Sequence, residues 1–225
     1  QAPGQARHQA KLAAQFAILL LDRGEPVQFQ PHPPKLGVQF PVFRGKAPGA
    51  SVFSMRLGEV TIAGIDDDGY YQEQAARTNA RISNMSWFVG GDSDYDIFAA
   101  SYDAAVRDAL PAEPGSQPVL FVFAAGNGGN ASGDGLGGSA GSVSSPSTGK
   151  NVISVGALEQ FRNITHTAVI QGFTNQPWVG VSDSADQVAA YSSRGNVGVG
   201  VEGVFGRFKP DLVAPGSWVL SCQAS

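Results

Sequence analysis

The sequence predicts an α/β fold: a three-layer, doubly wound and mostly parallel sheet with helices on its faces. Short apolar runs rich in Val and Phe, of which residues 119–125 (VLFVFAA) are the clearest, are typical of strands buried in a parallel sheet. Between such runs lie segments with the helical spacing of apolar residues, of which residues 96–110 are the clearest. Strands that alternate with helices in this way favour a doubly wound sheet.

The other elements follow from the same patterns. We expect a short helix in residues 11–21, strands in residues 51–57, 81–87 and 151–157, and a helix in residues 71–80. Asp94 or Asp96 is placed to cap the helix of residues 96–110, and Pro111 is placed to end it. Residues 1–43 are rich in Gln and Pro and predict an irregular segment, so we set the domain at residues 44–225.

Composition and charge argue against some classes of partner. The 225 residues carry a net charge of −4 and no basic stripe, which argues against nucleic acid and against an anionic membrane surface. The longest apolar run near the N-terminus, residues 16–21, is too short to be a membrane segment. The single cysteine, Cys222, cannot pair within the chain. Because the chain begins with Gln1, we expect a fragment or a processed product.

Several separated segments resemble, in order, motifs of the subtilase family of serine peptidases. The segments are KAPGASVFSMRL (residues 46–57), ISNMSW (82–87), FAAGNG (123–128), NVISVGA (151–157), YSSRG (191–195) and KPDLVAPG (209–216). Each motif alone is weak to moderate, and their common order carries the resemblance. It covers residues 44–221 and implies an incomplete subtilisin-like domain that acts on a polypeptide substrate.

The resemblance implies that Asn127 donates a hydrogen bond to the oxyanion of the transition state. Asn127 directly follows a predicted buried strand, and its neighbours Gly126 and Gly128 are small enough to let a substrate approach closely. From these three residues alone, the alternative is an asparagine in a tight Asn-Gly turn.

The same resemblance implies a substrate pocket between two segments, which in the family bind the substrate backbone as additional strands. One wall would consist of Ser86, Trp87 and Phe88, and the other of Ala124, Ala125 and Gly126. The family usually has glycine after the Ser-Trp or Ser-Leu pair, and here either Phe88 occupies the position of that glycine or two residues are inserted before Gly90. The side-chain specificity of the pocket therefore stays open.

The other catalytic motifs of the family are absent from the sequence. His8, His32 and His166 lack the His-Gly-Thr-His context and are expected at the surface, and Asp22 resembles the catalytic aspartate only superficially. No Gly-Thr-Ser-Met motif follows residues 209–216. The resemblance implies a serine endopeptidase of the Ser-His-Asp type, and because these motifs are missing we expect the present residues to be inactive alone. A non-catalytic, peptide-binding or structural relative is the alternative.

No cofactor is required for this chemistry. The acidic residues 66–69 (DDDG) would suit a structural calcium ion, although a solvated acidic turn is favoured. A dinucleotide site is rejected, because the glycines of residues 126–131 (GNGGNA) are not followed by helical periodicity. The resemblance also implies an extracellular or cell-envelope location, and the oligomeric state stays open.

Overall fold

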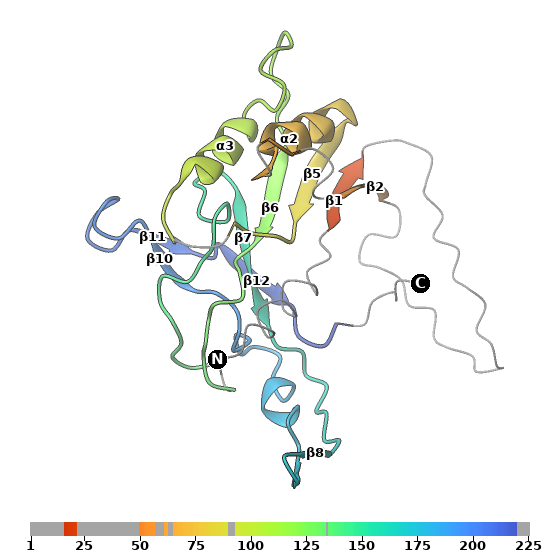
Figure 1. Ribbon diagram of the computed structural model, residues 1–225, viewed down its shortest axis with the longest axis vertical. Coiled ribbons are helices and arrows are strands. Elements are labelled where there is room, and N and C mark those ends of the chain that lie inside the picture. The colour runs from red at the N-terminus through yellow and green to blue at the C-terminus, as the bar shows by residue number, and fades with distance from the viewer. Residues whose placement is uncertain are drawn as a thin grey trace, which may run out of the picture.

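A six-stranded sheet organises the protein in the computed structural model shown in Figure 1. The structure describes residues 16–21 (as backbone), 50–56, 61–62, 65–89, 93–133 and 135–219. The strands are β1 (Phe16–Leu21), β2 (Ser51–Arg56), β3 (Thr61–Ile62), β4 (Ile65–Asp66), β5 (Ala80–Met85), β6 (Leu120–Ala124), β7 (Ile153–Leu158), β8 (Ala168–Ile170), β9 (Phe173–Asn175), β10 (Gly195–Val197), β11 (Arg207–Lys209) and β12 (Leu212–Pro215). The helices are α2 (Asp68–Arg77), α3 (Ile97–Ala105) and the short 3-10 helix η1 (Val179–Val181).

The order of strands in the main sheet is β12-β7-β6-β5-β1-β2. The four strands β5, β6, β7 and β12 run parallel to one another, while β1 is antiparallel to both β5 and β2. The apolar run VLFVFAA supplies β6, which lies between β5 and β7 as predicted for a central strand. The predicted α/β class with a mostly parallel sheet is therefore confirmed.

An aromatic core joins the sheet to the two longer helices. Helices α2 and α3 contact each other, and α2 also contacts β5 (Figure 1). Alternate residues of β6, Phe121 and Phe123, are fully buried and meet the ring of Tyr102 from α3 at centroid distances of 5.0 and 4.8 Å. Trp87 meets Phe123 edge-on at 5.7 Å. Such edge-to-face contacts add to the free energy gained by burying the rings.

An aspartate caps the N-terminus of each of the two longer helices, α2 and α3. Asp67 caps α2 and accepts a hydrogen bond from the Gly69 amide at 3.0 Å. Asp96, one of the two residues predicted to cap α3, accepts a hydrogen bond from the Ala99 amide at 2.9 Å. A carboxylate at this position satisfies an amide that has no partner within the helix.

Three element predictions need correction. Residues 16–21 form strand β1 rather than part of a helix, because the consecutive apolar run pairs with β2 and β5. Helix α2 begins at Asp68 rather than at residue 71, since Asp67 caps it. Helix α3 ends at Ala105 rather than at Leu110, and a tighter turn follows it, in which the Arg107 amide donates to the Ala104 carbonyl at 3.0 Å.

The buried carboxylate of Asp103 links α3 by hydrogen bonds to the residues that precede β7. Asp103 accepts hydrogen bonds from the amides of Lys150 (2.8 Å) and Asn151 (2.6 Å) and from the Tyr95 hydroxyl (2.9 Å). Because these donors occupy both carboxylate oxygens, the charge is well compensated although the residue is only 6% exposed.

Candidate functional site

The segments that follow β5 and β6 lie at the same edge of the sheet. The two strands are parallel, with Asn84 opposite Val122 and Met85 opposite Phe123. Because Met85, the last residue of β5, is paired one residue before the end of β6 at Ala124, residues 86–88 and residues 125–126 leave the sheet from neighbouring strand ends. This is the edge at which ligands bind in parallel α/β sheets.

The predicted first wall combines two exposed side chains with a buried one. Ser86 is exposed, and Phe88 is 43% exposed. Trp87 is only 6% exposed, and its indole nitrogen donates to the Met85 sulfur at 3.3 Å in the core. The indole therefore packs inward, and a substrate at this wall would meet the Trp87 backbone.

The backbone groups of the two walls differ in their hydrogen bonding. Residues 86–88 make no backbone hydrogen bond to any residue that the structure describes. The buried Ala125, by contrast, donates to the Val155 carbonyl at 2.9 Å and accepts from the Ser144 amide at 3.0 Å. The second wall is thus fixed to the interior, while the first leaves backbone donors and acceptors for another chain.

Asn127 is exposed on the loop that follows β6, and Ala124 at the end of this strand is also exposed. The Asn127 side chain makes no hydrogen bond within the described part of the chain, so its amide is available to a ligand.

Gly126 is buried directly before Asn127 and has a positive φ of 112°. A β-carbon at this position would lie 2.8 Å from the Ser193 hydroxyl and 2.9 Å from the Ser144 hydroxyl. The loop that carries Asn127 therefore depends on glycine at this position, both for its backbone conformation and for its packing.

The comparison with protein families identifies the family of this chain. The profile of the subtilase family, peptidase family S8, matches residues 28–225. The chain belongs to the subtilase family. The match includes residues 28–43, and the domain boundary that we set at residue 44 stays a prediction.

A bacterial relative supports the same assignment. This subtilase is 29% identical to the serine protease AprX of Bacillus subtilis over 191 residues, which is 81% of the present chain. The matched region is 35% of that protein, so this subtilase spans about a third of the length of its relative.

The histidine in the described part of this subtilase, His166, is exposed on the segment that leads to β8. The other triad candidates weighed above, Asp22, His8 and His32, lie outside the described residues. Asn127 and the two walls are therefore the predicted site residues that the described structure brings together.

One residue of this site was missed by the sequence analysis. Ser193 was noticed only as part of the YSSRG motif, yet its hydroxyl accepts a hydrogen bond from the Gly128 amide at 2.9 Å. The two residues are 65 positions apart in the sequence, and no local pattern indicates that they meet.

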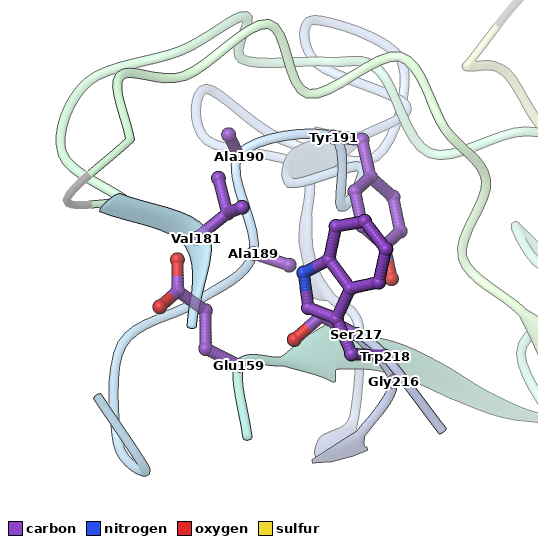
Figure 2. Close-up of a pocket in the computed structure, with 8 residues that line it drawn as sticks. All are labelled: Glu159, Val181, Ala189, Ala190, Tyr191, Gly216, Ser217 and Trp218. Carbon is purple, nitrogen blue, oxygen red and sulfur yellow. The ribbon is translucent and has the colours of Figure 1, made fainter. Parts of the chain in front are cut away.

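A pocket of about 300 Å³ in this subtilase lies beside Glu159 (Figure 2). Val181 and Glu159 lie on one side of it, with Tyr191 and Trp218 opposite. Glu159 is 1% exposed, and neither of its carboxylate oxygens has a hydrogen-bond partner in the part of the chain that the structure describes. Burial raises the pKa of Glu159, and the negative charge of Asp183 raises this pKa further.

Glu159→Gln is expected to raise the melting temperature at neutral pH, because it removes a buried charge without changing the shape of the side chain. A carboxyl group whose pKa is higher in the folded state makes stability fall as pH rises from its unfolded pKa to its folded pKa. The gain in melting temperature should therefore disappear below about pH 4, where Glu159 of the wild type is protonated in both the folded and the unfolded state.

Thermal unfolding of both proteins as a function of pH measures this difference. Glu113→Gln, at a side chain 49% exposed, is the matched control and should show a smaller effect. Equal melting temperatures of Glu159→Gln and wild type at every pH would contradict the burial of this carboxylate.

Possible metal ligands are the His, Cys, Asp and Glu side chains of the described residues. No three His, Cys, Asp or Glu side chains lie close enough together in this part of the chain to hold a metal ion. In the acidic loop, the Asp67 side chain caps α2, and the structural calcium ion stays a prediction. None of the helices in the described ranges is long and apolar enough to cross a lipid bilayer.

Proposed function

We propose that the protein containing this chain is a serine endopeptidase, and that the described residues bind its polypeptide substrate and stabilise the oxyanion. The observation that carries the proposal is the position of Asn127. Its exposed amide has no partner in the described part of the chain and stands at the sheet edge where residues 86–88 leave their peptide groups unpaired.

Substrate binding follows from these unpaired peptide groups. An extended polypeptide can add as a strand between residues 86–88 and 124–126, with main-chain hydrogen bonds supplying the affinity. Phe88 is exposed beside this path and would contact substrate side chains, whereas the buried Trp87 would contribute through its backbone.

Catalysis by Asn127 would be electrostatic. When a nucleophile attacks the scissile carbonyl, negative charge develops on its oxygen, and the side-chain amide of Asn127 donates a hydrogen bond to that charge. Because the charge is fully formed only near the transition state, the interaction raises kcat more than it tightens substrate binding.

The nucleophilic serine and the histidine base of this family belong to motifs that the sequence does not contain. We therefore propose that the 225 residues alone bind substrate and do not hydrolyse it.

The test uses the full-length protein and a chromogenic peptide amide. We expect hydrolysis that a peptidyl phosphonate abolishes by covalent labelling of one serine, whereas the 225-residue chain, folded by circular dichroism, should be neither active nor labelled. Labelling of the 225-residue chain would contradict its inactivity. A folded full-length protein that neither hydrolyses the amide nor reacts would overturn the endopeptidase proposal.

A non-catalytic peptide-binding function is the second candidate, favoured by the unpaired backbone of residues 86–88. It predicts saturable binding of an extended peptide, measured by calorimetry, without turnover by the full-length protein. Family membership supports an extracellular or cell-envelope location as a further proposal, and the net charge of −4 gives no support to nucleic acid as a partner.

A further inference from the structure

We propose that Ser193 is a positioning residue that fixes the direction of the Asn127 side chain by holding the peptide groups on both sides of it. The inference rests on the proposed function, because it takes Asn127 as the oxyanion donor.

Ser193 is bonded to both neighbours of Asn127. Its amide donates to the Gly126 carbonyl at 3.0 Å, and its hydroxyl accepts from the Gly128 amide at 2.9 Å. Ser193 is fully buried, so water cannot easily replace either bond. One residue thus clamps the tripeptide that carries the exposed amide of Asn127.

The tripeptide needs such a clamp because its own sequence provides little rigidity. Two of its three residues are glycines, which have more backbone freedom than any other residue type. The Asn127 side chain makes no bond to the described residues that could fix it directly. Its direction is therefore set by the backbone on either side.

The rest of the loop is held mainly by backbone bonds. The Gly129 amide donates to the Tyr191 carbonyl at 3.0 Å, and the Ala131 amide donates to the Ala190 carbonyl at 2.9 Å. Among the described residues, the Ser193 hydroxyl is the only side-chain group from outside residues 126–131 that bonds residues 126–128. It is therefore the tether that a point substitution can remove without changing the backbone.

Ser192 offers a matched control. It is also buried, and its hydroxyl also accepts a backbone hydrogen bond at 2.9 Å, but from Ala157 on β7 instead of the Asn127 loop. Ser192→Ala and Ser193→Ala therefore remove bonds of the same type and length from neighbouring positions. A general loss of stability should affect both variants alike.

The first experiment is a kinetic double-mutant cycle on the full-length protein. Ser193→Ala is expected to lower kcat by about tenfold with KM within about twofold, because small displacements of a catalytic group are costly. Ser192→Ala should leave kcat within about twofold of wild type at a similar melting temperature. In an Asn127→Ala background, Ser193→Ala should cause no further loss of kcat, since the group that it positions is gone. An equal loss of kcat in both backgrounds would overturn the proposal.

The second experiment does not depend on activity. The Gly128 amide should exchange with deuterium at least about tenfold faster in Ser193→Ala than in wild type, and should be unchanged in Ser192→Ala. If the full-length protein is inactive but Gly128 exchange responds in this way, the proposed function fails and the clamp stands. Unchanged Gly128 exchange in Ser193→Ala would overturn the clamp whatever the activity.

Discussion

Replacing Asn127 with alanine is expected to lower kcat of the full-length protein by about 10²–10³, the magnitude known for loss of the corresponding donor in subtilisin itself. KM should change by less than about threefold, because the lost hydrogen bond is made in the transition state and not to the bound substrate. Steady-state kinetics on a peptide amide measure both constants.

Two further variants sharpen this test. Asn127→Asp keeps the shape of the side chain but places a negative charge beside the oxyanion, so the loss of kcat should be at least as large. Asn175→Ala, on the exposed hairpin formed by β8 and β9, is the control and should leave both constants unchanged. A rise in KM at constant kcat for Asn127→Ala would assign Asn127 to ground-state binding instead.

Trp87→Ala is expected to reduce the free energy of unfolding by about 3–5 kcal/mol, the usual cost of truncating a large buried aromatic side chain. The indole is 6% exposed and contacts Tyr102 and Phe123 edge-on at 6.0 and 5.7 Å. Its removal would leave a cavity between β6 and α3 and a Met85 sulfur without its donor. Urea unfolding followed by tyrosine fluorescence or circular dichroism measures the loss.

The neighbouring Phe88 provides the comparison. Its side chain is 43% exposed, and Phe88→Ala should cost less than about 1 kcal/mol of stability. If Trp87→Ala were no more destabilising than Phe88→Ala, the indole would have to face the proposed substrate site rather than the core.

Trp87 also illustrates what the sequence could have revealed. Ser83, Met85 and Trp87 are all buried, so the two-residue alternation of β5 continues past its last paired residue. Family resemblance placed Trp87 at the cleft without separating backbone from side chain. The strand period was the available signal that the indole points inward.

Residues 16–21 show where local patterns fail. A run of six apolar residues has no polar positions from which a period of 3.6 or 2 could be recognised, and helix and strand remain equally open. What decides the outcome is pairing with β2 and β5, and β5 begins at Ala80, far along the chain. The central strand β6 was predicted correctly because Val and Phe dominate its sequence.

The tethers between residues 126–131 and 190–193 have a consequence for the order of assembly. Strands β5 and β6, which carry the proposed substrate-binding segments, are complete once Ala124 has been synthesised, and synthesis proceeds from the N-terminus. The partners of the Gly126 carbonyl and the Gly128 amide are synthesised more than 60 residues later. On the ribosome, β5 and β6 are therefore synthesised before the residues that bond the Asn127 loop. The conformation of this loop is completed only when residues 190–193 have been made.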